Sequence, residues 1–213
     1  MKSKRSFIIG WIALCLVFAM PFSVAAAQEI GKVAKVRGTA HIVRKDVDRP
    51  IAVSVGMPVY LNDEVRTAAK SSLRIKLEDG SILTLGPKGH LQLSHFEFEP
   101  EKKKRSALFD MFRGKLRVFA KDHETYKKKD FKIKTPTAIC GVRGTLFLVW
   151  VLSDEVTKVF CFKKEVGVAN VYSPGEVVVL VPNYGTDVVL RNTPSQPAFT
   201  SPGQQHDAVK DLG

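Results

Sequence analysis

The residues that could bind a metal ion are few and scattered. The five histidines are His41, His90, His95, His123 and His206. None has metal-ligand spacing with a second His or Cys, although His90 and His95 could approach each other across a turn. A zinc site at that turn would still need a third ligand. The sequence therefore predicts no metal centre.

The carboxylates and nucleophiles form no recognisable catalytic set either. Glu97 and Glu99 lie two residues apart and would share one strand face, as a carboxylate pair of a glycoside hydrolase could, but nothing separates an acid from a base. No nucleophile lies in an elbow motif. The segment 141–144 is too short for a phosphate-binding loop and lacks its lysine. We therefore expect a protein that is not an enzyme and that uses no cofactor.

The most distinctive residue types surround Arg143. Pro136 fixes its own backbone angle, whereas Gly141 and Gly144 allow angles that other residues resist, so the chain is expected to bend here. Residues 146–152 are then apolar throughout, which predicts a strand buried on both faces. The guanidinium of Arg143 offers five donors and keeps its charge. Either it ties down loop carbonyls or a carboxylate near the core, or it recognises a partner.

Two cysteines, Cys140 and Cys161, follow the predicted leader segment. Cys140 lies in the bend and Cys161 in an expected strand. If the strands before and after Asp154 pair as neighbours, a disulfide is geometrically possible and would contribute on the order of 3 kcal/mol. The alternative is two buried free thiols that act as small hydrophobic residues. The sequence leaves both alternatives open.

The chain is basic, with a formal net charge of +12. The charge is concentrated in two runs, Lys102, Lys103, Lys104 and Arg105, and Lys127, Lys128 and Lys129. Solvated loops between strands are the default explanation of such runs. The alternative is a basic patch that binds an envelope protein, an anionic polymer or a lipid surface. No aromatic residues alternate with the lysines to stack bases, so nucleic acid is not an expected partner.

The elements that would position these residues are short strands. Residues 72–78 alternate strictly between apolar and polar types, as a half-buried strand does. Asp79 and Gly80 then turn the chain into a second strand at 82–85. Similar signals recur along the chain and favour an all-β fold, either a layered sandwich or a short β-helix-like stack of short strands. At most one short helix is expected, near 101–112, where an apolar stripe has helical spacing.

Both ends differ from this core. Residues 1–27 combine early cations, an apolar run and the small residues 25–27, the layout of a secretory signal peptide that is cleaved before Gln28. The alternative is an uncleaved anchor, although the run is short for a membrane span. Cleavage would leave no transmembrane helix and a periplasmic or secreted protein. Residues 191–213 are rich in proline and poor in hydrophobic residues, which predicts a flexible C-terminal tail.

Five short segments resemble, in the same order, the pattern of the FecR-like domain, a periplasmic all-β module. They are Gly56-Met57-Pro58-Val59 with Asn62-Asp63-Glu64-Val65-Arg66-Thr67, Leu77-Glu78-Asp79-Gly80-Ser81-Ile82-Leu83, Phe112-Arg113-Gly114-Lys115-Leu116-Arg117, Thr135-Pro136, and Gly141-Val142-Arg143-Gly144-Thr145. The resemblance places the β domain at residues 28–190. It implies that the motif residues are mainly structural: Asp63, Thr67, Asp79, Gly80, Thr135, Pro136, Gly141, Arg143, Gly144 and Thr145.

The resemblance also implies a function. Members of the iron-uptake signalling branch carry a cytoplasmic anti-sigma segment, a transmembrane helix and a receptor-contacting domain, and we expect none of these in this sequence. The expected function is non-enzymatic binding of a protein or an anionic envelope component in the periplasm or at the cell surface. The alternative is a periplasmic sensor or regulatory module that signals through a separate membrane partner. The sequence does not indicate an oligomeric state.

Overall fold

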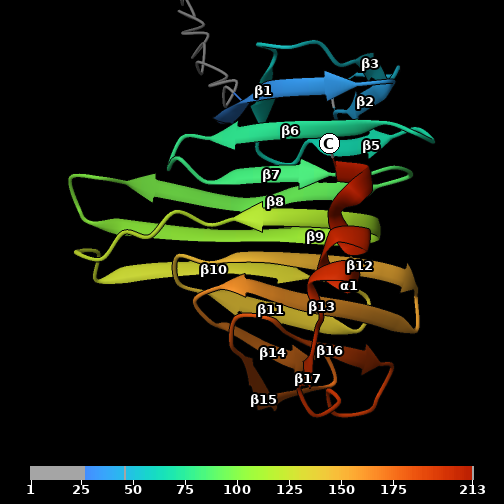
Figure 1. Cartoon of the computed structure of the whole chain (residues 1–213). Helices are drawn as coiled ribbons and strands as arrows, with labels where there is room; N and C mark the ends of the chain where they lie inside the picture. The colour runs from blue at the N-terminus through green and yellow to red at the C-terminus, as the bar shows by residue number, and fades with distance from the viewer. Residues whose placement is uncertain (1–26, 46, 213) are drawn as a thin grey trace, which may run out of the picture.

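A computed structural model describes residues 27–45 and 47–212 (Figure 1). Almost all of the predicted signal peptide lies outside the described residues, so its cleavage and the domain boundaries stay predictions. The described residues form strands β1 to β17, one α-helix and one 3-10 helix. The all-β prediction is therefore confirmed. Neither helix in the described part of the chain is long and apolar enough to cross a membrane.

The strands form two sheets that share the long strand β9. The first sheet contains, in spatial order, β4 (Pro58–Tyr60), β1 (Glu29–Arg37), β6 (Ser72–Leu77), β7 (Ile82–Leu85), β9 (Lys104–Phe119), β12 (Leu146–Ser153), β13 (Val156–Lys163), β16 (Tyr184–Val189) and β17 (Ala198–Phe199). The second contains β3 (Ile51–Ala52), β2 (Ala40–Val43), β5 (Glu64–Thr67), β8 (His90–Glu99), β9, β10 (Lys128–Lys134), β11 (Ala138–Val142), β14 (Val166–Asn170) and β15 (Ser173–Leu180). Neighbouring strands are antiparallel, except that β9 and β10 are parallel.

The inner faces of the two sheets enclose one hydrophobic core. Ile75 and Phe147 of the first sheet belong to the same buried cluster as Phe109 and Phe131 of the second. In both sheets the strand order broadly follows the chain from one end of the molecule to the other (Figure 1). The fold is thus a layered sandwich that also has the progressive stacking expected from the sequence.

The prediction of a helix near residues 101–112 is wrong, because β9 occupies most of this segment. Buried and half-exposed positions alternate from Lys104 to Met111, which is the period of a strand. Phe109 points into the core, whereas Phe112 is 40% exposed on the outer side. Apolar residues on both sides of the strand produced the apparent helical stripe.

The C-terminal segment differs from the flexible tail predicted for residues 191–213. β17 pairs with β16, and α1 (Pro202–Val209) then packs on the outer face of the first sheet, followed by η1 (Lys210–Leu212) (Figure 1). Ser201 and Gln204 form a capping box that begins α1. The cluster beneath the helix consists of Leu148, Ala208 and Leu212, with Phe160, Phe162 and Val209 against it. Burial of this cluster fixes the segment onto the sheet.

Cys140 and Cys161 are both buried free thiols. The expected pairing across Asp154 does form, between β12 and β13. However, Cys140 lies in β11 of the second sheet, opposite Val168, and Cys161 lies in β13 of the first sheet. Both thiols are free, so the structure differs from the disulfide alternative and agrees with two buried free thiols.

Both thiols are expected to be unreactive in the native protein. Burial raises the pKa of Cys140 to about 12 and that of Cys161 to about 11. Since the thiolate is the reactive form, a thiol reagent at about pH 8 should label neither residue until denaturant is added. Peptide mapping by mass spectrometry distinguishes them from Cys15. Rapid labelling of either native thiol, or a peptide pair that separates only on reduction, would contradict this arrangement.

Candidate functional site

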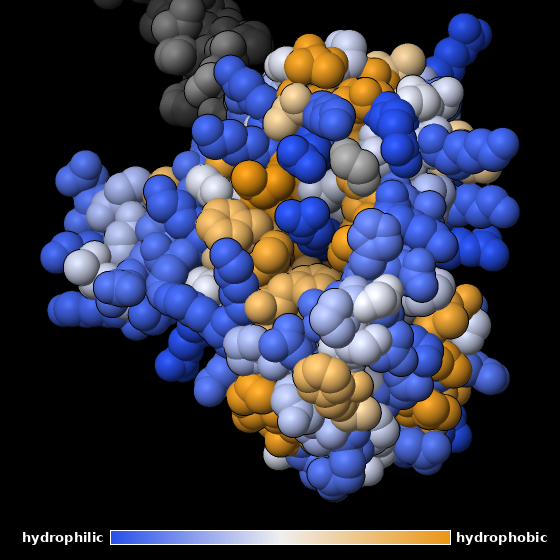
Figure 2. All heavy atoms as spheres, in the orientation of Figure 1, coloured by the Kyte–Doolittle hydropathy of each residue, from blue (hydrophilic) through white to orange (hydrophobic). Residues whose placement is uncertain are grey.

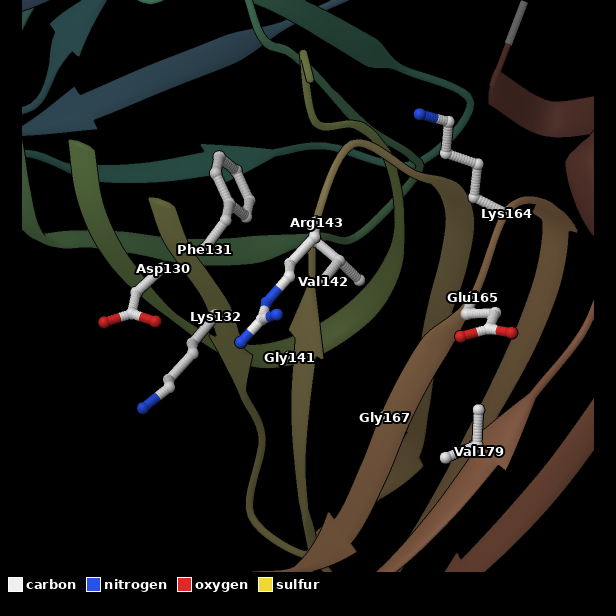
Figure 3. A pocket seen from close by; sticks show the side chains of 10 residues that line it. All are labelled: Asp130, Phe131, Lys132, Gly141, Val142, Arg143, Lys164, Glu165, Gly167 and Val179. Carbon is white, nitrogen blue, oxygen red and sulfur yellow. The ribbon is translucent and has the colours of Figure 1, made fainter. Parts of the chain in front are cut away.

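An open groove on the outer face of the second sheet contains the arginine of the bend (Figure 3). Its volume is about 710 Å³, within the range of pockets that bind small ligands. Strands β10, β11, β14 and β15 form its walls and floor, and the turn from β13 to β14 closes one end. The residues that line it are Asp130, Phe131, Lys132, Gly141, Val142, Arg143, Lys164, Glu165, Gly167 and Val179.

Two glycines form the floor of the groove. Gly141 of β11 lies directly opposite Gly167 of β14, and the same row continues to Lys132 on one side and Val179 on the other. A side chain at Gly141 would project into open space, with no neighbouring atom within 4 Å. The backbone is therefore accessible along the centre of the row, where a ligand can approach it closely.

Arg143 stands at one end of this floor and is exposed. Val142 points into the core and Gly144 has a φ of 76°, so the turn directs Arg143 outward. Its side chain runs back over β11 above Gly141 (Figure 3). Within the described part of the chain, its guanidinium has no hydrogen-bond or ion-pair partner. The prediction that Arg143 ties down a loop near the core is therefore wrong, and five donors are left available.

The other charged residues of the groove differ in whether they are paired. Lys132 is exposed and has no ion pair with any described residue. Lys164 bonds Asp122, and this contact raises the pKa of Lys164 and lowers the pKa of Asp122. The exposed carboxylates along the groove are Asp130 and Glu165. The groove thus offers two cations without an ion pair among the described residues, Arg143 and Lys132. The carboxylates beside them would attract a basic side chain.

The wall opposite Lys132 is apolar and belongs to an edge strand. Among the described strands, β15 forms a ladder with β14 only, so its other side carries unpaired backbone groups. Val177 and Val179 of β15 are 56% and 52% exposed. Exposed apolar side chains on a free edge are typical of a surface that receives another chain.

The threonines of the bend hold the ends of β11. Thr135, beside Pro136, accepts a hydrogen bond at Oγ1 from the backbone N–H of Ala138, at 2.8 Å. Thr145 donates from Oγ1 to the carbonyl oxygen of Glu165, also at 2.8 Å. These bonds connect the bend to β10 and to the turn before β14. They position Arg143 indirectly, because they fix the backbone on both sides of it.

Asp63 and Thr67 have structural roles outside the groove. Strands β8 and β9 lie between them and β10, the first strand of the groove. Asp63 is fully buried and pairs with Arg44, whose Nε and Nη2 lie 2.7 and 2.8 Å from its two carboxylate oxygens. Thr67 accepts a hydrogen bond at Oγ1 from the N–H of Gly89, at 2.8 Å. Neither residue contributes to the groove.

Asp79 and Gly80 form the turn between β6 and β7, as predicted. The Asp79 carboxylate accepts from the Ser81 N–H at 2.9 Å and lies 3.2 Å from Nη1 of Arg105. Arg105 is fully buried and also donates to the carbonyl oxygens of Lys121 and Lys129. The assignment of Arg105 to a basic surface patch is therefore wrong.

The two basic runs meet, but most of their charge is already paired. The parallel pairing of β9 with β10 places Lys104 opposite Lys128. The ion pairs join Lys102 to Glu99, Lys104 to Glu97, and Lys129 to Asp122. The remaining cations without an ion pair among the described residues are Lys103, Lys127 and Lys128. The patch is therefore smaller than the sequence indicated.

The residues first considered for metal binding and catalysis do not converge on one site. Over residues 27–45 and 47–212, no three potential metal ligands cluster. His90 contacts Glu64 and lies 4.7 Å, ring centre to ring centre, from Phe112. Glu97 and Glu99 both pair with lysines, as described above, so neither is a free acid or base.

Comparison with known proteins identifies a domain that includes most of the groove, up to Gly167. Residues 63–167 match the family described as FecR protein. Two crystal structures of a candidate anti-sigma factor from Parabacteroides distasonis ATCC 8503, at 2.50 and 1.65 Å resolution, each have a TM-score of 0.51 and 22% sequence identity to this chain. Each match covers 65% of this chain and 60% of the solved one, and no curated protein matches. This chain therefore contains a FecR family domain, which includes Arg143 and the bend that positions it.

Proposed function

We propose that this protein is a non-enzymatic regulatory module that binds a partner protein through the Arg143 groove. The observation that carries the proposal is the exposed guanidinium of Arg143, which has no partner among the described residues and stands over a glycine floor. The FecR family match and the fold shared with a candidate anti-sigma factor support a regulatory role. The signal-peptide pattern supports a periplasmic or cell-surface location.

The chemistry of the groove suits an extended segment of a protein. A planar guanidinium binds a carboxylate through two parallel hydrogen bonds, so an acidic side chain of the partner would sit at Arg143. Val177 and Val179 would receive its apolar side chains. The free edge of β15 would offer backbone hydrogen bonds, as in strand addition. Asp130 and Glu165 would attract a basic residue, so we expect a segment of mixed charge.

A second candidate function is a sensor that signals through a separate membrane protein. The fold shared with a candidate anti-sigma factor favours it, since anti-sigma regulation needs a route to the cytoplasm. In that case the partner in the groove would itself be a membrane protein. Binding of an anionic polymer or lipid surface by the two basic runs is less well supported, because most of those cations are paired.

Replacing Arg143 with Gln should weaken partner binding roughly tenfold to a hundredfold. Hydrogen bonds to a charged group contribute about 1.5–3 kcal/mol, and Gln keeps a polar side chain without the charge. A photo-crosslinking residue at Val177 should capture one protein in intact cells, and Arg143→Gln should reduce that capture. The same crosslinker at Val55, which is 65% exposed in another part of the chain, should not capture it.

Arg49→Gln is the matched control, because it removes the charge of another exposed arginine. Equal capture by wild type and Arg143→Gln would refute the role of Arg143. Equal capture from Val177 and Val55 would refute the groove. Since charge pairs at a surface are screened over about 8 Å at physiological salt, capture should also fall as ionic strength rises.

A further inference from the structure

A second groove crosses the outer face of the first sheet, on the layer opposite the Arg143 groove. It consists of three adjoining hollows with volumes of about 680, 180 and 340 Å³. Phe119 lines the first two, and Arg117 and Leu146 line the last two, so the hollows are continuous. Figure 2 shows hydrophobic side chains gathered in the middle of this face and surrounded by hydrophilic ones.

The floor of this second groove is an apolar row across three strands. Phe119 of β9 lies directly opposite Ile82 of β7 on one side and Leu146 of β12 on the other. Phe119 is 43% exposed, which is unusual for a large aromatic side chain in the middle of a sheet. The row runs perpendicular to the strands, so a ligand along it would contact side chains and not a free strand edge.

An aromatic cluster continues the floor at one end. The rings of Phe98, His123 and Tyr126 contact one another with ring centres 4.5 to 6.3 Å apart, and Tyr126 stacks on both of the others. Burial, together with the charge of Arg105, lowers the pKa of His123, so its ring is neutral at neutral pH. The hollow lined by these rings also contains Phe119. Flat apolar surfaces are therefore available along the first half of the groove.

Four cations border the groove: Arg74, Lys76, Arg117 and Lys121. None has an ion pair with a described residue, unlike Lys102, Lys104 and Lys129 on the other sheet. The Nε atom of Arg74 is buried and has no hydrogen-bond partner, which is costly unless a ligand supplies one. The carboxylates that line the hollows are Glu78, which is exposed, and Asp79, which is already bound to Arg105. The four cations therefore outnumber the one exposed carboxylate, so the groove has an excess of positive charge that complements an anionic ligand.

We propose that this second groove binds an acidic polysaccharide. The apolar face of a sugar ring packs on Phe119 and on the aromatic cluster, while a ring carboxylate is held between Arg74 and Arg117. The middle hollow, at about 180 Å³, is smaller than the 300–1,000 Å³ of a pocket for a whole small ligand, so it suits one unit of a longer chain. Its continuity with a hollow on each side lets the chain extend. This site is independent of the partner protein assigned to the Arg143 groove.

The experiment uses the purified protein and polygalacturonate as the probe, in a native affinity gel. Polygalacturonate should retard the protein, and its fully methyl-esterified form, which keeps the rings but loses the charge, should not. Arg117→Gln should weaken binding about tenfold or more, as expected for one lost charge-assisted hydrogen bond. Phe119→Ala should weaken it about twofold to tenfold, as for a lost ring contact. Circular dichroism should show that both variants remain folded.

The matched control is Arg49→Gln, which removes one exposed positive charge elsewhere and should bind as wild type. A loss for Arg49→Gln equal to that for Arg117→Gln would overturn the site. Equal retardation by polyglutamate, with no effect of Phe119→Ala, would overturn the sugar-specific proposal in favour of charge alone. Binding to phosphatidylglycerol vesicles but not to polygalacturonate would also overturn the polysaccharide proposal and would indicate a lipid surface as the ligand. Because no partner protein is present, the result does not depend on the Arg143 groove.

Discussion

Replacing Arg105 with Met is expected to lower the free energy of unfolding by about 3–5 kcal/mol, the typical cost of breaking a buried ion pair. Arg105 and Asp79 are both fully buried, with Nη1 3.2 Å from the carboxylate oxygen. Arg105 also donates to the carbonyl oxygens of Lys121 and Lys129, at 2.9 and 3.0 Å. Met fills much of the same volume but leaves Asp79 without its countercharge. Unfolding in urea, followed by circular dichroism, measures the loss.

Arg113→Met on the same strand is the control for Arg105→Met. Arg113 is exposed, so its replacement should change stability by no more than about 0.5 kcal/mol. Arg105→Lys should recover only part of the loss, because an ammonium cannot reach three acceptors in the planar arrangement of a guanidinium. If Arg105→Met and Arg113→Met are equally stable, the buried pair does not stabilise the fold.

Arg105 also shows what the sequence could not predict. In the run Lys102 to Arg105, four cations look alike, and a run of charge usually marks a solvated loop. Strand β9 begins at Lys104, and the alternation of side chains along the strand then directs Arg105 inward. Its partner Asp79 lies 26 residues away in a turn. The turn was predictable from Asp79 and Gly80, but the contact depends on how distant strands pack.

The strands themselves were largely predictable, because alternation is a local signal. Residues 72–85 show this best, since their pattern predicted two strands and a turn, and the structure has β6, β7 and the turn between them. The C-terminal segment was missed because proline and polar residues dominate its composition. A local signal was nevertheless present there: Ser201 and Gln204 have the spacing of a capping box, with Pro202 at the first helical position.

The Arg143 groove was predictable only in part. Pro136 and the two glycines predicted a bend at Arg143, and partner recognition was one of the two interpretations of that arginine. The sequence could not show that Gly141 and Gly167 would be neighbours, because that depends on the pairing of β11 with β14. Nor could the run of valines in β15 show which of them face outward. Those facts follow from the order of strands in the sheet, which is a long-range property.

Gly144→Ala is expected to destabilise the protein by about 2–4 kcal/mol. The backbone of Gly144 has a φ of 76°, where residues with a Cβ are strained by roughly 1–3 kcal/mol. A Cβ there would also lie 2.4 Å from Cβ of Asp122, which overpacks the site by a similar amount. Thermal and urea unfolding would measure the loss. The displaced Asp122 would also disturb its ion pair with Lys164.

Gly141→Ala separates this strain from the loss of the groove, because it adds the same methyl group where no neighbouring atom lies within 4 Å. Its stability should stay within about 0.5 kcal/mol of wild type, since the site is a half-buried strand position where the added methyl group displaces nothing. Its methyl group would nevertheless rise from the groove floor and should weaken capture of the partner from Val177. Equal stability of Gly144→Ala and Gly141→Ala would mean that the bend is not held at a positive φ. Because that bend directs Arg143 outward, the same result would remove the basis for the groove.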